Sequence, residues 1–373
     1  MTFTIQMLLD MVPPSGSPQT QTLWGTAGGD QIAAGSGSDT VYGLLGSDTI
    51  FAMPLWGERA EIYGGRGAAD GEDAADAISV SGEGSAAIYA NAGNDAILYR
   101  ALGNATIQAG LGDDDILILN KANNFVTGGA GLDRITIDSF ADNTVYGGNA
   151  AADPNDGADT ISIRGNGQNL VYANGGNDSI FIGGDGNNRI FAGLGDDVIR
   201  VQGVGSNVVV GGPGGDEILI EGSGNNTIFG GVDAMDPADG NDRITVVGDG
   251  HNVVLAGGGD DLVRIVGSVG TLIDGGAGND TIEGSDGLDR ITGGTGLNVL
   301  TGRAGADTFV HTPGGLDVIT DFDVYKGDRI DTGGERFTMA RTADGTLFLQ
   351  FGDASFVAIQ HAQPGLEANP FWV

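Results

Sequence analysis

The chain has 373 residues, of which 70 are Gly, 41 Asp and only 9 Glu, and its formal net charge is −34. Such an acidic chain repels phosphate groups, which excludes nucleic acid and anionic membrane as direct partners, and no apolar run is long enough to span a membrane. With 40% apolar residues it is too hydrophobic for a disordered acidic tail, and without cysteine it has neither disulfides nor thiolate metal sites.

Residues 1–23 are predicted to form an N-terminal segment or cap. The stretch Met1 to Met11 is apolar, but it has no basic n-region and no small-residue cleavage site, so we do not expect a Sec signal there. A segment of this size is also too short for a catalytic domain.

A repeat begins at Asp30 and runs to about residue 310. Each repeat contains an Asp that comes after glycines and is followed, two positions later, by an aliphatic residue. The Asp residues are spaced by nine near both ends and by 19 in the middle, with a step of 26 after every fourth turn. Four turns and one seven-residue insert therefore form a super-repeat of 83 residues, with copies starting near residues 64, 147 and 230.

Within one turn the hydrophobic residues alternate with period two, as in Thr160 to Ile163 and Ser179 to Ile182, which predicts short strands. Two aliphatic ladders recur, one led by Ile78 and the other by Ile88. Such ladders make a core only when neighbouring turns stack. The sequence therefore predicts an all-β parallel β-roll, or β-solenoid, of roughly fifteen turns with two short strands per turn, and not an unstructured Gly-rich linker.

The glycine turns expose backbone carbonyls and end in a carboxylate, and these oxygens are the ligands that Ca²⁺ prefers. Stacked turns would place the carboxylates about 4.8 Å apart, so a cation is needed between them; Asp as a simple turn former would not explain the recurrence. We expect on the order of ten to fifteen Ca²⁺ ions. The predicted ligands are Asp30, Asp39, Asp48, Asp76, Asp95, Asp114, Asp133, Asp159, Asp178, Asp197, Asp216, Asp242, Asp261, Asp280, Asp289 and Asp307.

Each seven-residue insert carries carboxylates at D-x-x-D-x-x-D spacing, of which the last is a ligand already named. The others are Asp70, Asp73, Asp153, Asp156, Asp236 and Asp239. They form either acidic solvated loops, docking points for a neighbouring molecule or additional cation sites; three acids so close together favour the cation.

The stretches Gly25 to Ala33 and Gly275 to Glu283 resemble the nonapeptide G-G-x-G-x-D-x-U-x of RTX (repeats-in-toxin, hemolysin-type) calcium-binding proteins. The resemblance covers roughly residues 24 to 331 and implies a stand-alone β-roll over residues 24–310. The stretch Gly305 to Asp331 also resembles the end of the roll in serralysin-type proteases. That likeness implies a β cap and a type I secretion signal in residues 311–373, with the cap over Phe337 to His361 and the signal in Glu367 to Val373.

In the 19-residue zone the second half of each turn carries Asn where the usual RTX roll has Asp. The residues are Asn124, Asn143, Asn169, Asn188, Asn207, Asn226 and Asn252, while Ala86, Ala105 and Thr271 break the pattern. We predict one calcium edge and one neutral edge of hydrogen-bonded Asn side chains, with calcium on both edges only near the ends.

No enzymatic activity is expected, because the sequence contains neither H-E-x-x-H nor G-x-S-x-G and its few aromatic and basic residues look scattered. The leading hypothesis is a secreted structural protein that folds on Ca²⁺, leaves by type I secretion and self-assembles in an extracellular layer, matrix or filament. The alternative is a calcium-dependent adhesin for a cell surface or polysaccharide; a third hypothesis is a companion of a secreted enzyme. Ice binding is not expected, because the turns carry no Thr ladder.

Overall fold

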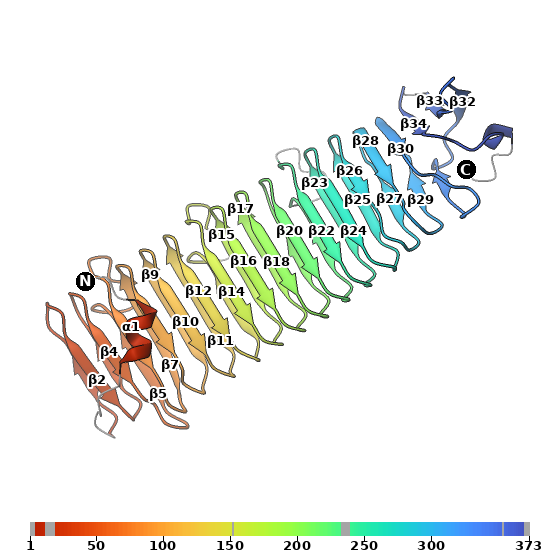
Figure 1. Ribbon diagram of the computed structural model, residues 1–373. Coiled ribbons are helices and arrows are strands. Elements are labelled where there is room, and N and C mark those ends of the chain that lie inside the picture. The colour runs from red at the N-terminus through yellow and green to blue at the C-terminus, as the bar shows by residue number, and fades with distance from the viewer. Residues whose placement is uncertain (1–3, 12–18, 151–152, 233–238, 353, 369–373) are drawn as a thin grey trace. The chain divides into compact units, whose positions relative to one another are not determined.

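The computed structural model describes residues 4–11, 19–150, 153–232, 239–352 and 354–368. The chain divides into two compact units, Met1–Leu194 and Gly195–Val373. Each unit consists almost entirely of parallel strands wound in successive turns (Figure 1). No helix in the described ranges is long and apolar enough to cross a lipid bilayer. The predicted all-β parallel solenoid with two strands per turn is confirmed.

In the first unit each turn supplies one strand to each of two parallel sheets, which we call the odd sheet and the even sheet after their strand numbers. The odd sheet contains β1 (Thr22–Trp24), β3 (Thr40–Tyr42), β5 (Arg59–Tyr63), β7 (Ser85–Ala92), β9 (Ala105–Leu111), β11 (Asn124–Ala130), β13 (Asn143–Tyr146), β15 (Leu170–Gly175) and β17 (Arg189–Leu194). The even sheet contains β2 (Gln31–Gly35), β4 (Thr49–Ala52), β6 (Ala77–Val80), β8 (Ala96–Tyr99), β10 (Asp115–Leu119), β12 (Arg134–Asp138), β14 (Thr160–Arg164) and β16 (Ser179–Gly183).

The second unit repeats this arrangement. Its odd strands are β19 (Val208–Val210), β21 (Thr227–Phe229), β23 (Val253–Gly258), β25 (Leu272–Ala277), β27 (Arg290–Thr292), β29 (Thr308–Val310) and β31 (Arg329–Asp331). Its even strands are β18 (Val198–Gln202), β20 (Glu217–Glu221), β22 (Arg243–Val247), β24 (Leu262–Val266), β26 (Thr281–Glu283), β28 (Gly296–Thr301) and β30 (Gly315–Ile319).

The C-terminal region of the second unit forms the predicted β cap. It contains β32 (Phe337–Arg341), β33 (Leu347–Phe351), β34 (Phe356–Ile359) and the short 3-10 helix η1 (Leu366–Ala368). Strand β34 adds in parallel to β30, and β33 and β32 then continue the sheet in antiparallel order. The change of direction ends the stacking of turns on the even sheet.

The core of each unit is the pair of predicted aliphatic ladders. Ile78 lies in register with Ile97, and Ile116 with Ile135. These side chains, like Ile88 and its successors on the odd sheet, are at most 1% exposed. Burying each contributes about 1.5–3 kcal/mol, but only when the turns above and below are in place, so stability is cooperative along each unit.

Helix α1 (Ile5–Asp10) lies on the outer face of the even sheet of the first unit (Figure 1). Leu8 is 1% exposed because it packs on Ala77, Ala96 and Leu98. The two alanines are outward-facing positions whose small side chains leave room for a helix. Of the predicted N-terminal segment, residues 1–3 and 12–18 lie outside the described residues.

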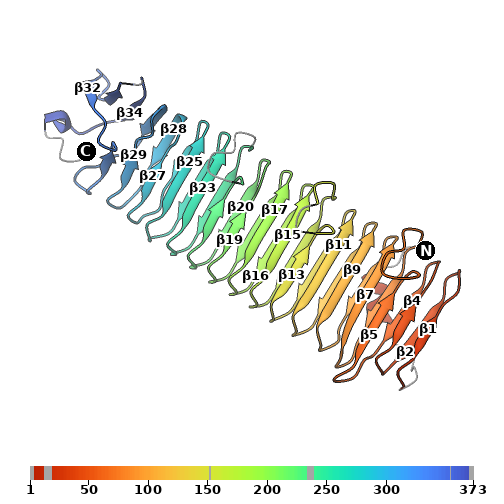
Figure 2. The same cartoon turned by 180° about the vertical axis from the view of Figure 1, so that it is seen from behind.

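The expectation that aromatic residues are scattered was wrong. On the outer face of the odd sheet, Trp24, Tyr42, Tyr63 and Tyr89 stack with ring centroids 4.1, 4.8 and 5.0 Å apart (Figure 2 shows these strands from behind). A second stack follows on β13, β15 and β17, formed by Tyr146, Tyr172 and Phe191 with spacings of 5.3 and 4.9 Å. The register of parallel strands places all these residues in one column.

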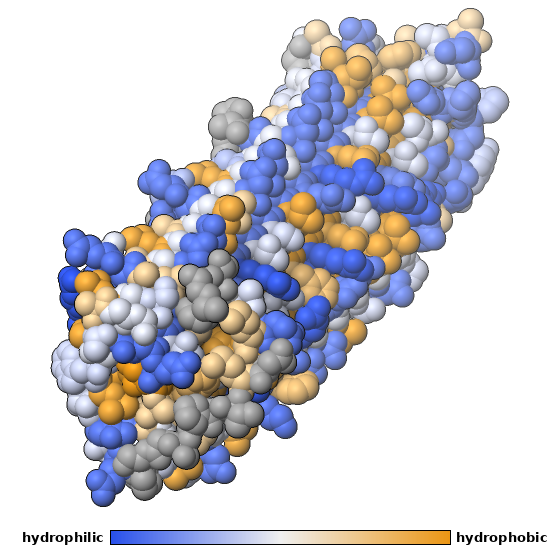
Figure 3. Space-filling view, turned by 60° about the vertical axis from the view of Figure 1, so that its left-hand side comes forward, coloured by the Kyte–Doolittle hydropathy of each residue, from blue (hydrophilic) through white to orange (hydrophobic). Residues whose placement is uncertain are grey.

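Exposed hydrophobic side chains are otherwise dispersed. On the face shown in Figure 3, apolar residues are interleaved with polar ones and form no single broad patch. The most exposed large side chains, Trp56 and Tyr325, belong to different units. Large apolar patches are typical of protein interfaces, so this face gives no indication of a purely hydrophobic association.

Candidate metal sites

The Asp residues that precede the even strands form a regular row in each unit, which we call the acidic edge. In the first unit, Oδ1 of each Asp accepts a hydrogen bond from the backbone N–H of the Asp one turn earlier: Asp95 donates to Asp114 at 2.8 Å, and Asp114 to Asp133 at 2.8 Å. In the second unit, Asp216 donates to Asp242 in the same way at 2.8 Å. One oxygen of each carboxylate is thus held by the neighbouring turn.

The second carboxylate oxygen, Oδ2, is buried and has no hydrogen-bond partner at most of these positions. None of these carboxylates pairs with a Lys or Arg side chain among the described residues. An unpaired buried oxygen that can only accept costs free energy unless a donor or a cation faces it. On the acidic edge such an oxygen is found at Asp48, Asp76, Asp95, Asp114, Asp133, Asp159, Asp216, Asp242, Asp261, Asp280 and Asp317. Asp39, which precedes the odd strand β3 and so lies on the opposite edge, has one as well.

Backbone carbonyls converge on the same places. A Cβ added at Gly128 would meet both Asp133 Oδ2 and the carbonyl oxygen of Gly147, and one added at Gly211 would meet Asp216 Oδ2 and the carbonyl oxygen of Gly230. No group of three or more acidic or His side chains gathers round one point in the described part of the chain. A cation here would therefore be held by few carboxylates and several carbonyls, an all-oxygen set that fits Ca²⁺.

The opposite edge, which we call the amide edge, shows what occupies this space without a cation. Asn169 donates its backbone N–H to Asn188 Oδ1 at 3.0 Å, as the acidic edge does. Its Nδ2, which stands where Asp has Oδ2, donates to Gly167 O at 3.1 Å and Asn188 Oδ1 at 2.8 Å. The amide ladder continues from Asn124 to Asn143 and from Asn226 to Asn252. The predicted hydrogen-bonded Asn row is confirmed.

The breaks in the Asn pattern have local explanations. Beside Ala86 and Ala105, the buried Tyr99 from the even sheet reaches across the core, and its hydroxyl lies 3.0 Å from the carbonyl oxygens of both Gly103 and Asn104. Thr271 donates its backbone N–H to Asp289 Oδ1 at 2.6 Å. The amide edge thus changes to carboxylates towards the C-terminal cap.

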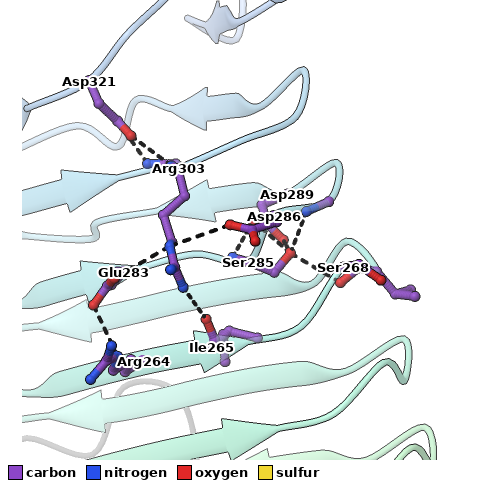
Figure 4. A network of polar contacts seen from close by, with 12 residues as sticks. Arg264, Ile265, Ser268, Glu283, Ser285, Asp286, Asp289, Arg303 and Asp321 are labelled. Atoms are coloured by element: carbon purple, nitrogen blue, oxygen red, sulfur yellow. Dashed lines mark hydrogen bonds and ion pairs between the residues drawn. The ribbon is translucent and has the colours of Figure 1, made fainter.

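Two of the predicted ligands have a hydroxyl beside the carboxylate. Thr26 donates its N–H and hydroxyl to Asp30 Oδ2 at 2.6 and 2.9 Å. Ser285 lies against Asp289 (Figure 4) and donates its N–H to Asp289 Oδ2 at 2.6 Å, with its hydroxyl 2.9 Å from Oδ1. These donors partly neutralise both carboxylates, so they fit a cation less well than their neighbours.

Figure 4 also shows how the basic residues of this region are used. The guanidinium of Arg303 reaches Glu283 at 3.4 Å, Asp286 at 3.5 Å and the carbonyl oxygen of Ile265 at 3.3 Å. Arg264 pairs with the same Glu283 at 3.2 Å. These cations are on the outer surface and do not reach the acidic edge.

Sequence reasoning missed Asp317 and Asp328. Asp317 is 1% exposed, its Oδ1 accepts from Asn298 Nδ2 at 2.9 Å, and its Oδ2 has no partner. The signal was the 19-residue step from Asn298 to Asp317. Asp328 lies on the opposite edge, where it accepts the N–H of Asp307 at 3.0 Å as Asp307 accepts that of Asp289 at 2.9 Å, so it extends these carboxylates beyond the last predicted ligand.

The acids of the inserts have two different environments. The first acids stabilise the loops in which they lie. Asp70 accepts hydrogen bonds from the backbone N–H groups of Arg66 and Glu72. Asp153 accepts them from the N–H groups of Asn149 and Asn155. The second acids, Asp73 and Asp156, each have a buried Oδ2 without a hydrogen-bond partner. Asp239 accepts the N–H of Gly240 at 3.0 Å. Asp236 lies outside the described residues.

Burial raises the pKa of most acidic-edge carboxyls. It raises the pKa of Asp76, Asp159 and Asp242 to about 9, where the nearby insert acid adds to the effect, and that of Asp133 to about 7. The ordinary value is 3.8. Without a cation, several of these groups would hold a proton at neutral pH.

These shifts predict the pH dependence of the calcium-free protein. A carboxyl whose folded pKa exceeds its unfolded value stabilises the fold below about pH 4 and loses this contribution as the pH rises through the folded pKa. The melting temperature after chelation and desalting should therefore fall as the pH rises from about 4, until the calcium-free chain no longer folds near neutral pH. In saturating Ca²⁺ it should instead rise with pH, because protons compete with the ion. Repeating the scan in high salt screens surface repulsion but not these buried groups; a flat calcium-free profile in salt would contradict the assignment.

The model of the RTX calcium-binding nonapeptide repeat (4 copies) matches five segments, residues 15–52, 102–135, 109–143, 164–199 and 274–309. Among solved structures, the chain is similar to a hyperactive, Ca²⁺-dependent, β-helical antifreeze protein from an Antarctic bacterium, with 21% identity, 85% of this chain and 90% of that chain covered and a TM-score of 0.44. A search of curated proteins finds no match.

Proposed function

Because the chain is a β-solenoid of RTX calcium-binding repeats, we propose that it is a secreted structural protein that folds on Ca²⁺ and self-assembles into an extracellular layer, matrix or filament. The observation that carries the proposal is the row of buried carboxylate oxygens without partners on the acidic edge. Such a fold is unfavourable where calcium is scarce and favourable where it is plentiful, since the energy of metal binding becomes folding energy.

This dependence suits export in an unfolded state. A chain of net charge −34 repels itself without cations and stays expanded. It would pass a type I secretion channel unfolded and fold outside the cell, where calcium is abundant. The proposed secretion signal spans Glu367 to Val373, of which residues 369–373 lie outside the described residues.

Self-assembly is supported by a difference between strand edges. In the second unit the even sheet ends in the antiparallel cap β32–β34, while β31, the last strand of the odd sheet, pairs only with β29 among the described residues. In the first unit, β1 pairs only with β3, and β2 only with β4, among the described residues. Exposed strand edges are templates for pairing with another chain. We place the contact between copies at the edges of β1 and β2.

The proposal extends to the inserts, each of which would hold an additional cation. Asp73 raises the pKa of Asp76 by charge repulsion, Asp156 does so for Asp159, and Asp239 for Asp242. Repulsion of this kind requires the two carboxylates to be close. A cation between the second and third acid of each insert would remove it.

Assembly can be tested by light scattering and electron microscopy with and without millimolar calcium. Ordered arrays or fibres are expected only with calcium. Thr22→Lys, which places a charge on the exposed strand β1, should slow their growth, whereas Thr227→Lys within the odd sheet of the second unit should not. A persistent monomer in calcium would overturn the structural role and favour the alternative, a calcium-dependent adhesin for a cell surface or polysaccharide. Ice binding would be recognised as thermal hysteresis.

A further inference from the structure

The column of stacked aromatic rings on the odd sheet is interrupted in the first unit. Tyr89 lies in register with Gln108 on β9, Gln108 with Thr127 on β11, and Thr127 with Tyr146 on β13. Two polar residues thus stand where the turns before and after carry rings. The side chain of Gln108 is exposed and makes no hydrogen bond within the described residues.

A cavity lies over this interruption. Its volume is about 360 Å³, within the range of roughly 300–1,000 Å³ found for small-molecule sites. Gln108 and Thr127 line it together with Ala68 to Gly71 of the first insert, and Leu111 adds an apolar wall that is 48% exposed.

The polar wall of the cavity is held in place before any ligand arrives. Asp70 donates its N–H to Asn91 Oδ1 at 3.1 Å and accepts the N–H of Arg66 at 3.1 Å. Asn91 in turn donates its Nδ2 to the carbonyl oxygen of Tyr89 at 2.9 Å. Fixed polar groups reduce the ordering cost of binding.

The lining determines the class of ligand. It contains one carboxylate, the amides of Asn91, Gln108 and Asn149, the hydroxyl of Thr127 and apolar surface, but no Lys, Arg or His. The Thr127 hydroxyl also donates to the carbonyl oxygen of Ile107 at 3.5 Å, and Asn149 Nδ2 donates to Asp153 at 3.0 Å. The absence of a cation among these residues disfavours anions. A mixture of donors and acceptors beside apolar carbon matches a ring that carries several hydroxyl groups.

We propose that this cavity binds a neutral saccharide of one or two sugar rings. The inference goes beyond the structural role and does not depend on self-assembly. The next super-repeat does not have this interruption. The residue 83 positions after Gln108 is Phe191, whose ring stacks on Tyr172 at 4.9 Å and continues the column there.

The internal repeat supplies the test. In Gln108→Phe a ring should stack on Tyr89, as Phe191 does on Tyr172, so the variant should fold while the cavity is filled. The matched control is Thr144→Phe, which adds a ring to the same sheet face beside Phe125 but outside the cavity lining. Thr127→Val is a second variant that removes one hydroxyl at constant volume.

Binding of cellotriose, maltotriose and mannotriose is measured by calorimetry in millimolar calcium, with trigalacturonate as the anionic comparison. At least one neutral sugar should bind the parent and Thr144→Phe equally, at least about tenfold more weakly to Gln108→Phe and about fivefold more weakly to Thr127→Val. The proposal is overturned if no neutral sugar binds, if Gln108→Phe binds as well as the parent, or if trigalacturonate binds as tightly. None of these results bears on the assembly of the calcium-loaded protein.

Discussion

Removing calcium at neutral pH should convert the folded protein into an expanded coil. Leaving an ionised carboxylate buried without a partner costs several kcal/mol, whereas the whole stability of a typical domain is about 5–15 kcal/mol. The acidic edge holds many such groups, so a few of them, once ionised, exceed the available stability. At neutral pH a proton relieves Asp76 and Asp159, whose pKa burial raises to about 9. Burial raises the pKa of Asp48 and Asp280 only to about 6, so these two carboxyls are mostly ionised at pH 7.

The measurement is far-UV circular dichroism with small-angle scattering during EGTA titration. The β signal should disappear in a cooperative transition, the radius of gyration should rise, and both should return on adding calcium. Mg²⁺ at the same concentration should not restore the fold, because it demands octahedral geometry and gives up its water reluctantly. Persistence of the β signal in excess EGTA would refute the role of calcium as a folding ligand.

The stacking of turns could be predicted from sequence because the signal recurs. Ile78 and the residues that follow it at steps of 19 and 26 occupy one column, and a single inward position tolerates little but aliphatic side chains. The amide edge was predictable for the same reason, since Asn143, Asn169 and Asn188 keep one place in the repeat.

The aromatic column was missed although its residues also share one place. Trp24, Tyr42, Tyr63 and Tyr89 are separated by 18, 21 and 26 residues, because turns near the N-terminus differ in length. Only the register of the parallel strands shows that they are neighbours. Outward positions also tolerate many residue types, so the pattern is weak in sequence.

Contacts between distant segments could not be derived from the repeat. Helix α1 packs on Ala77 and Ala96, and Tyr99 crosses the core to the carbonyls near Ala105. Both the helix and the Tyr99 ring occupy space that is left by alanine side chains. The sequence shows where the small residues lie, but it does not show which distant side chain packs against them. The cavity over Gln108 arises likewise, from a missing ring and an insert that folds beside it.

The difference between the amide edge and the acidic edge can be tested by a substitution that exchanges one side-chain nitrogen for an oxygen. Asn169→Asp turns the Nδ2 that donates to Gly167 O and Asn188 Oδ1 into an oxygen, so two hydrogen bonds become contacts between acceptors. The side chain is 3% exposed, and the new charge has no cation beside it. Leaving a buried charge without a partner in this way costs about 3–5 kcal/mol. We therefore expect the free energy of unfolding, measured with urea in calcium that saturates the parent protein, to fall by that amount.

The matched control is Asn166→Asp, which makes the same chemical change three residues away. Asn166 is exposed, and its Oδ1 accepts the N–H of Asp185 at 3.1 Å, a role that a carboxylate oxygen can keep. Its stability should change by no more than about 0.5 kcal/mol. Equal effects of the two substitutions would mean that the amide ladder does not replace a cation. If calcium well above the concentration that saturates the parent protein restores the Asn169→Asp variant with one more ion bound, a single oxygen is enough to turn the amide edge into an acidic one, because the carbonyl groups around it are already in place.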